Sequence, residues 1–392
     1  MSPAIVRRGR AILRMGGSTL DVQRYDRFRE VLARSSFDAV VAASPANTWY
    51  LSECNIMTQK ALPERLAIVV WPKLGEPVYV VCGLEAGQAR AESWIKDIRD
   101  YVEFVQSPID LAVAALSEMG LTGGRIGYEA TFLTAHYYDQ LKAGLPDATL
   151  LPVDGFFDRV RMIKTAWEQS VLEDAFRATD RAIRRAFEAT APGQTEKEVS
   201  DRLQVELLRE GAEGTAFSVL CTGVNSLITH PVPAGRVIAD GELMRTDFGG
   251  IFGGYYSDVA RTVVVGRPSD RQVATYEWIW AMHERLIAAM TPGRPVAELY
   301  NLCQTTYIDA GYPCDRPHIG HGVGLGLHEH PMIAPGTKEI LQPGMCLCIE
   351  PNLTVPGVEK YHTEDLILVT EHGPRVLSRS ADWSKLLCVT GG

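Results

Sequence analysis

The sequence predicts an α+β protein with two domains, an α/β domain at residues 1–158 and a larger α+β domain at residues 159–392. Three observations lead to this prediction. The chain has 392 residues, and one domain usually takes about 100–200. In the first part, short apolar runs alternate with segments of helical spacing. In the second part, a pattern of helices and Pro-Gly turns recurs at an offset of 100 residues.

The smaller domain is predicted from alternating strands and helices. Its helices are expected at residues 21–35 and 109–119, where apolar residues recur every three to four positions. Its strands are expected at residues 37–43, 66–71, 78–82 and 125–129, which are short apolar runs. This alternation predicts an open sheet with mostly parallel or mixed pairing.

The larger domain should begin after the segment 152–165. Thr165 and Glu168 have the spacing of a capping box and predict a helix of about 25 residues. Thr195 and Glu198 predict a second helix in the same way, which should end near Gly211.

An internal repeat then relates two parts of this domain. Pro192-Gly193, Glu198 and Gly211 recur as Pro292-Gly293, Glu298 and Gly311. We interpret the two copies as similar α+β halves that face each other across a pseudo-two-fold axis. Such halves would leave a cleft between their sheets, where a site could lie. Chance recurrence of Pro-Gly turns is the alternative.

Composition excludes several classes of protein. The net charge is −9, whereas a nucleic-acid binder usually shows a basic excess. No apolar run reaches the ~20 residues that a membrane helix needs, and no secretory signal is visible. The eight cysteines form no C-x-x-C pair, so we expect reduced, partly buried thiols in a cytoplasmic protein. Cys346 and Cys348 share one face of a strand-like run, where core packing is favoured over metal binding.

Two aspartates suggest a cation site. Asp247 and Asp258 are expected on two strands joined by a turn at residues 249–254, and paired strands can bring both side chains to one face. Like charges placed close together need a cation or a proton between them. A pair of turn aspartates without such a role is the alternative.

Further metal-type ligands follow along the chain. His321 stands between glycines, Glu350 ends a strand-like run, and Glu364 precedes another. One histidine with four carboxylates is an oxygen-rich set that suits Mn, Fe, Co or Zn, and two ions more easily than one. A zinc site built on thiolates is not what this spacing offers.

In these contexts, the order Asp, Asp, His, Glu, Glu resembles the creatinase / prolidase / aminopeptidase P family, to which the methionine aminopeptidases are related. The resemblance covers the whole chain, and its most specific stretch is residues 230–365. It implies a pita-bread catalytic domain preceded by a creatinase-like N-terminal domain.

The resemblance also implies roles for individual residues. Asp247 would chelate one metal ion, Asp258 and Glu364 would bridge two, and His321 and Glu350 would hold the other. A water shared by both ions would be the nucleophile, with Glu350 as the proton acceptor. His230 matches a histidine near the substrate, and His328 matches one thought to stabilise the tetrahedral intermediate.

Three positions depart from the pattern of proline-specific relatives. Their histidine four residues before the metal histidine is Pro317 here, with His318 three before. Their arginine two residues before the last glutamate is His362, which should face the site with Glu364. Arg245 stands where an apolar residue is usual, and could bind a substrate carboxylate or pair with an acid as structure. It argues against the dimethylsulfoniopropionate lyase branch, which has a third metal-binding aspartate there.

A segment of the first domain also resembles the family. In dimers, the family segment corresponding to residues 47–51 caps the neighbour's site. Trp49 and Tyr50 could therefore supply an apolar wall for the substrate, with core packing as the alternative. The resemblance implies a homodimer on this ground.

The leading hypothesis is a dinuclear Xaa-Pro peptidase of prolidase or aminopeptidase P type, acting on small peptides with manganese, or with cobalt, zinc or iron. The alternative enzyme is a creatinase-like or ectoine-derivative-type hydrolase that cleaves a C–N bond of a small non-peptide amide or amidine. A binding module of this fold without catalysis is a third reading, which the complete ligand set argues against.

Overall fold

The computed structural model describes residues 22–62, 64–314 and 316–391. These residues form two compact units, 22–161 and 162–391. The boundary expected after residue 158 falls inside helix α8 (Asp154–Arg161). In that helix the rings of Phe156 and Phe157 pack against Phe28, with ring centroids 5.5 and 6.1 Å away. These aromatic contacts attach α8 to the N-terminal unit.

The N-terminal unit is built on one six-stranded mixed sheet with the order β4-β3-β2-β1-β5-β6. Strand β1 is antiparallel to β2 and parallel to β5, which confirms the mixed sheet. The strands are β1 (Ala39–Ala42), β2 (Ile68–Pro72), β3 (Val78–Cys82), β4 (Asp97–Tyr101), β5 (Arg125–Tyr128) and β6 (Thr149–Pro152). The helices besides α8 are α2 (Val22–Arg34), α3 (Pro45–Ser52), α4 (Met57–Ala61), α5 (Ala86–Glu92), α6 (Pro108–Glu118) and α7 (Ala135–Gly144).

The helices of the C-terminal unit confirm the repeat. They are α9 (Ala166–Glu188), α10 (Glu196–Arg209), α11 (Asp270–Ala288) and α12 (Val296–Asp309). Both predicted capping boxes are formed, at Thr165 and at Thr195. Helices α10 and α12 have the same bounds shifted by 100 residues. Before them, Gly193 and Gly293 adopt φ values of 92° and 87°, a left-handed conformation that glycine adopts without strain.

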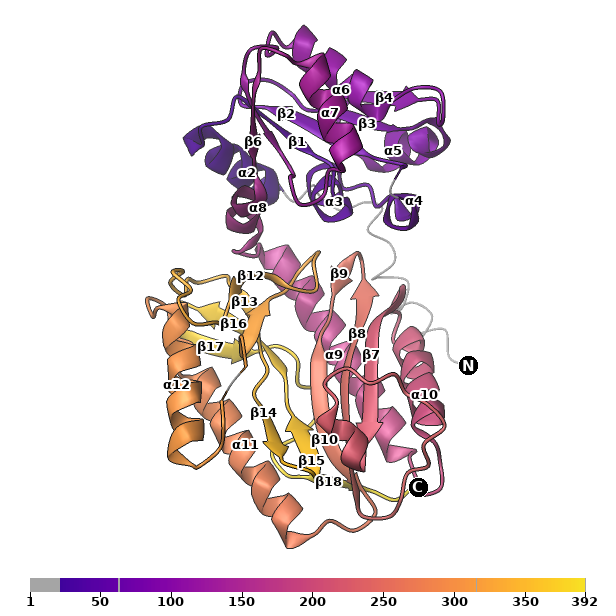
Figure 1. Ribbon diagram of the computed structural model, residues 1–392, viewed down its shortest axis with the longest axis vertical. Coiled ribbons are helices and arrows are strands. Elements are labelled where there is room, and N and C mark those ends of the chain that lie inside the picture. Colours follow the sequence, from indigo (N-terminus) through magenta and orange to yellow (C-terminus); the bar gives the residue numbers. More distant parts are fainter. Residues whose placement is uncertain (1–21, 63, 315, 392) are drawn as a thin grey trace. The chain divides into compact units, whose positions relative to one another are not determined.

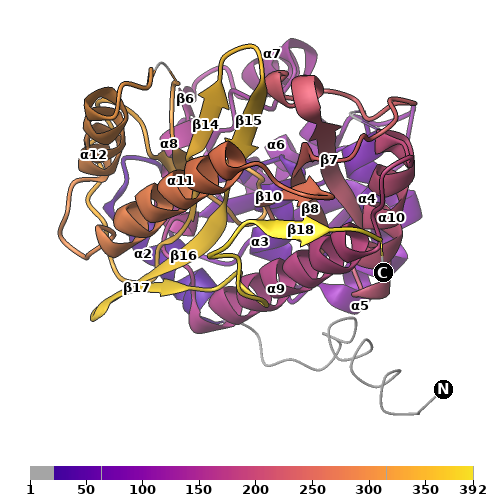
Figure 2. The ribbon, with the colours of Figure 1, turned by 90° about the horizontal axis from the view of Figure 1, so that it is seen from below.

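The strands of the C-terminal unit form two five-stranded sheets and one hairpin. The first sheet has the order β18-β10-β8-β7, with β9 added to β8, and the second has the order β12-β11-β13-β16-β17. Helix α9 packs on β8, β10 and β16, and α11 on β13 and β17 (Figures 1 and 2).

The bounds of the first sheet are β7 (Gly214–Thr222), β8 (Glu242–Phe252), β9 (Tyr255–Tyr256), β10 (Val259–Val265) and β18 (Leu387–Val389). Those of the second are β11 (Gly320–Gly322), β12 (Glu329–Met332), β13 (Cys346–Ile349), β16 (Asp365–Thr370) and β17 (Gly373–Val376). The hairpin pairs β14 (Asn352–Val355) with β15 (Glu359–His362).

The predicted hairpin between Asp247 and Asp258 forms, but its turn was placed too early. Strand β8 continues through Gly249 and Gly250 to Phe252, and the turn follows at residues 253–254. A Cβ atom at Gly249 would lie 1.9 Å from the Ser257 carbonyl oxygen. Glycine therefore serves here to let two strands approach closely, rather than to make a turn.

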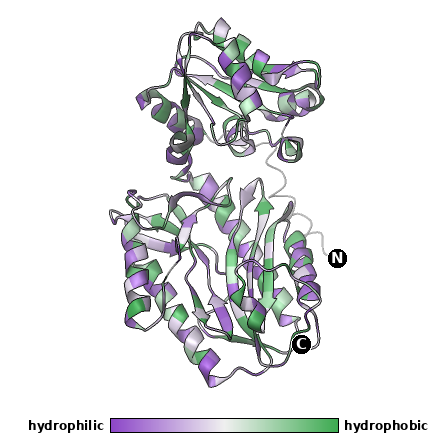
Figure 3. Ribbon diagram, in the orientation of Figure 1, coloured by the Kyte–Doolittle hydropathy of each residue, from purple (hydrophilic) through white to green (hydrophobic). Residues whose placement is uncertain are grey.

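Helices with one apolar face cover these sheets. Helix α9 buries Leu172, Phe176, Ile183 and Phe187, which follow its helical period. Purple and green segments accordingly alternate along the helices in Figure 3. Within the described residues, no helix has the length and apolar content that crossing a bilayer requires. All eight cysteines are free thiols.

Candidate metal centre

Strands β8 and β10 bring the two predicted aspartates together with a glutamate. Asp247 lies in β8 opposite Ala260, and Asp258 immediately precedes β10. Glu364 immediately precedes β16, and its amide donates a hydrogen bond to the Ala260 carbonyl oxygen. One carboxylate oxygen from each of the three residues lies within 4.8 Å of the others.

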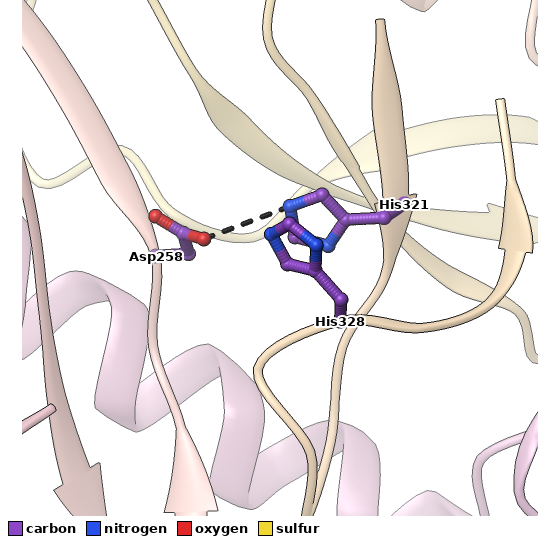
Figure 4. Close-up of side chains that lie close together, drawn as sticks. All are labelled: Asp258, His321 and His328. Carbon is purple, nitrogen blue, oxygen red and sulfur yellow. Dashed lines mark ion pairs between the residues drawn. The ribbon is translucent and has the colours of Figure 1, made fainter. Parts of the chain in front are cut away.

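His321 and Glu350 approach the same point from the second sheet. Strand β11, which carries His321, pairs with β13, which ends one residue before Glu350. His321 Nε2 lies 3.6 Å from Asp258 Oδ2, 3.7 Å from Glu350 Oε1 and 3.9 Å from Glu364 Oε1. Figure 4 shows Asp258 and His321 pointing toward each other.

Glycines make this approach possible. A Cβ atom at Gly320 would lie 2.1 Å from the Cys348 carbonyl oxygen, and one at Gly322 would lie 2.6 Å from that of His330. Larger residues on either side of His321 would therefore separate the strands.

The carboxylates of this cluster fit a bound cation. Asp247 Oδ1, Asp258 Oδ1 and Glu364 Oε1 are buried without a hydrogen-bond partner among the described residues. Burial and the charges of neighbouring carboxylates raise the pKa of Asp258 and of Glu364 well above their usual values. Divalent cations would supply the missing partners and remove this repulsion.

Cys348 also lies within ligand distance, in a group with His321 and Glu364. Burial, and then the charges of Glu364 and Asp258, raise the pKa of the Cys348 thiol well above its usual value. A protonated thiol is a poor metal ligand, so Cys348 serves as a core residue beside the cluster.

Two predicted substrate-binding histidines lie beside Glu350. His318 Nδ1 is 3.3 Å from Glu350 Oε1, and His362 Nε2 is 3.5 Å from Glu350 Oε2. Burial alone would favour a protonated Glu350, but the two histidines beside its oxygens hold its pKa well below the usual range. Glu350 is therefore an ionised carboxylate with a basic group at each oxygen.

The two predicted catalytic histidines lie in different settings. The His328 ring packs against His321, with centroids 3.9 Å apart, and Figure 4 shows the rings side by side. Partial burial, with a further effect of His321, lowers the pKa of His328 to about 4. His230 lies on an exposed loop after the 3₁₀ helix η2 (Gly223–Leu227), and no ion pair joins it to the cluster within the part of the chain that is described.

The other predicted substrate-binding residues are buried. Trp49 and Tyr50 lie in α3 of the N-terminal unit, with 9% and 0% of their surface exposed. Arg245 is buried in β8, where its Nε donates to the Ser226 carbonyl oxygen and its Nη2 to those of Ile228 and Thr229. These contacts occupy the Nε–Nη2 edge of the guanidinium, one of its two edges for a bidentate carboxylate contact.

Replacing Arg245 with methionine is expected to loosen the loop that leads to His230 without removing bound metal. Three backbone carbonyls would lose a charged donor, at a cost of about 1–3 kcal/mol. Hydrogen exchange of residues 223–230 would measure the loss, and metal content would be measured alongside. Arg245→Lys keeps the positive charge but loses the planar guanidinium with its several donors, so this variant should show most of the increase in hydrogen exchange. Unchanged exchange in both variants would contradict this role.

A buried ionic network behind the cluster was not predicted from the sequence. Arg261 Nη2 lies 2.7 Å from Asp180 Oδ1 and 2.8 Å from Asp365 Oδ1. Arg261 Nη1 donates to the Glu364 carbonyl oxygen at 2.6 Å, and Arg379 Nε to Asp365 Oδ2 at 2.7 Å. The available signals were an arginine three residues after Asp258 and an aspartate directly after Glu364, each within an apolar strand. The network holds the backbone that carries Glu364.

Acidification from pH 6.5 toward 4 is expected to destabilise the metal-free protein partly through His283, which lies in α11. Burial lowers the pKa of His283 to about 4. The charge of Asp365 opposes this shift, and the charges of Arg379 and Arg261 add to it. The unfolded chain takes up a proton near pH 6.5, whereas the folded ring stays neutral, so stability falls by roughly 3 kcal/mol across this window. Urea unfolding of wild type and His283→Leu at several pH values would measure this contribution. Equal pH dependence in both proteins would contradict it.

Two family models match the chain. The model described as the creatinase/prolidase N-terminal domain matches residues 24–163, and the model described as metallopeptidase family M24 matches residues 170–371. The chain belongs to metallopeptidase family M24. The family implies divalent metal ions, and the M24 domain contains all five predicted ligands. The architecture is accordingly a creatinase-like α/β domain followed by a pita-bread catalytic domain.

Known peptidases are similar to this chain over most of its length. The uncharacterized peptidase YqhT of Bacillus subtilis is 32% identical over 65% of this chain and 73% of its own. The Xaa-Pro dipeptidase of Lactobacillus delbrueckii subsp. lactis is 28% identical over 93% of this chain and 99% of its own. The solved Xaa-Pro dipeptidase from Bacillus anthracis has a TM-score of 0.83 at 26% identity, covering 94% of this chain and 99% of that one.

Proposed function

We propose that this M24 protein is an Xaa-Pro dipeptidase with two divalent metal ions. The observation that carries the proposal is the cluster of four carboxylates and one histidine, in which three buried oxygens have no hydrogen-bond partner among the described residues. Relatives that cover nearly the whole chain bear the name Xaa-Pro dipeptidase, and they supply the substrate class.

Five residues would hold the ions: Asp247, Asp258, His321, Glu350 and Glu364. When bound, the ions would lower the pKa of a water molecule and polarise the scissile carbonyl. Manganese is the metal we propose, because a carboxylate-rich set with one imidazole suits it.

The surrounding residues would handle protons and substrate. Glu350 stays ionised between His318 and His362, so its oxygen that does not hold an ion would take up a proton from the attacking water. His328 has a lowered pKa; its neutral ring can donate one hydrogen bond to developing negative charge on the carbonyl oxygen without first losing a proton. His318 and His362 would also orient the substrate beside Glu350.

Cleavage of Ala-Pro, Ala-Pro-Ala and Ala-Ala by the manganese-loaded protein tests this function. We expect cleavage of Ala-Pro and little cleavage of Ala-Ala, with Ala-Pro-Ala separating a dipeptidase from an aminopeptidase. The metal content of the same sample would be measured. Failure to cleave any of the three with metal bound would contradict the proposal and favour the hydrolysis of a small non-peptide amide or amidine.

We also propose that the protein works in the cytoplasm as a homodimer. Eight free cysteines, several of them buried, support a reducing compartment. The dimer rests on the resemblance of residues 47–51 to the segment that caps a neighbour's site. Light scattering of the purified protein would test it.

A further inference from the structure

A lysine that the mechanism does not use faces the metal centre. Lys360 lies in β15, two residues before His362, and side chains two apart in a strand share a face. His362 faces the centre, with its Nδ1 3.8 Å from Asp247 Oδ2. Glu359 takes the opposite face, where it accepts hydrogen bonds from side chains of α11. Lys360 is therefore directed to the same side as His362.

The charge of Lys360 has no acidic partner. The residue is 8% exposed, and no carboxylate of the described chain lies within 4.0 Å of its Nζ. Burial, followed by the positive charges of Arg245 and Arg316, lowers the pKa of Lys360 to about 8. The group still carries a proton at neutral pH, and a buried charge without a partner is costly.

A second cation, Arg316, contacts an aromatic ring rather than a carboxylate of the described residues, because its guanidinium Cζ lies 5.3 Å from the centroid of the Tyr307 ring. Arg316 precedes β11, and its Nη2 donates to the carbonyl oxygen of Asn352, the residue opposite His362 in the β14–β15 hairpin. The Nε and Nη1 atoms of Arg316 are buried without a hydrogen-bond partner among the described residues. No carboxylate of the described residues forms an ion pair with Arg316. The positive charge of Arg316 acts to lower the pKa of both Lys360 and His318.

We propose that Lys360 and Arg316 form a subsite for the carboxylate of the substrate. An ammonium and the N–H groups of a guanidinium are the donors that bind a carboxylate best. Among the described carboxylates, Asp247 is the one whose charge acts on Lys360, and it belongs to the metal centre. An anion from the substrate would therefore balance charges that no carboxylate of the described residues pairs with.

This inference rests on the proposed dipeptidase function and adds a preference for chain length. In a dipeptide, the free carboxylate belongs to the residue directly after the scissile bond. Residues two apart in a strand are roughly 7 Å apart, so Lys360 stands about the length of one substrate residue from His362. A longer peptide or a dipeptide amide would place an uncharged amide at this subsite.

The test compares Ala-Pro with its C-terminal amide, which differ only in the carboxylate. Manganese-loaded wild type should show a kcat/KM for Ala-Pro about 10- to 100-fold above that for the amide, the range expected for hydrogen bonds to a charged group. Lys360→Met should remove this preference by raising KM for Ala-Pro, with the amide kinetics and the metal content unchanged. Arg316→Met should lower the preference in the same direction.

Two variants serve as controls. Lys360→Arg keeps a cation and should keep much of the preference, which separates charge from packing. Lys338→Met removes an exposed lysine of the same unit and should change neither constant. A Lys360→Met enzyme that still prefers the acid over the amide by the wild-type factor would overturn the subsite.

A binding measurement separates the subsite from the proposed function. If wild type cleaves neither compound, the dipeptidase proposal fails, and calorimetry with L-proline then probes the subsite directly. Binding of proline that weakens about 10- to 100-fold in Lys360→Met would support a carboxylate site for another reaction. Equal binding to wild type and variant, or no binding to either, would overturn it.

Discussion

Replacing Asp258 with asparagine is expected to abolish metal binding and turnover together, while leaving the metal-free protein at least as stable as wild type. Asp258 belongs to two groups of ligand atoms in the cluster. Its carboxylate is buried against Glu364 and Asp247, which raises its pKa. Without metal, this carboxylate is repelled by its acidic neighbours. A neutral amide of the same shape should therefore reduce the repulsion in the metal-free protein.

Metal titration followed by thermal unfolding measures both parts of this prediction. At a metal concentration 100 times its Kd, wild type should gain about 2.7 kcal/mol, whereas the variant should gain little. Asp309→Asn, at an exposed position that ends α12, is the matched control and should behave as wild type. An Asp258→Asn protein that binds metal and turns over normally would remove Asp258 from the ligand set.

Replacing Arg261 with methionine is expected to produce the largest loss of stability of any single change considered. Arg261 is 1% exposed and lies between Asp180 and Asp365, which are also buried. Its removal would leave the buried Asp180 carboxylate without a cation and Asp365 with Arg379 alone, and breaking a buried pair in this way costs about 3–5 kcal/mol. Metal affinity should fall as well, because the Glu364 carbonyl oxygen would lose its donor.

Urea unfolding of the metal-free protein would measure the loss, and Arg375→Met is the matched control. Arg375 pairs with Glu173 at 3.2 Å, but its side chain is 53% exposed, so its removal should cost less than about 1 kcal/mol. Adding Asp180→Asn to Arg261→Met should recover part of the stability, because the carboxylate left without a cation disappears. Equal unfolding midpoints for Arg261→Met and wild type would show that the network does not stabilise the fold.

The sequence was sufficient for features that depend on local patterns. The strand at residues 78–82 was predicted with its observed bounds, because a short apolar run between turn residues has few alternatives. The capping boxes at Thr165 and Thr195 were found because a cap acts within four residues of chain. The repeat was visible because both halves need the same turn before their second helix.

Residue order also pointed to the metal centre, but not to its surroundings. Asp247, Asp258, His321, Glu350 and Glu364 could be chosen from the resemblance, and the structure gathers them at one point. The turn after Asp247 was misplaced because a glycine pair can serve a turn or a close strand contact. Only the position of Ser257 distinguishes these two uses.

The tertiary structure alone decided which charged residues are paired. Arg245, Arg261 and Lys360 are all cations in strands of one domain, and nothing in their local sequence separates them. Arg245 donates to the loop before His230, and Arg261 joins two aspartates 81 and 104 residues away in the chain. No carboxylate of the described residues lies within 4.0 Å of the Lys360 ammonium. The pairing of a buried charge depends on side chains that other segments bring within a few ångströms. Sequence order determines which groups are available, and packing determines which of them meet.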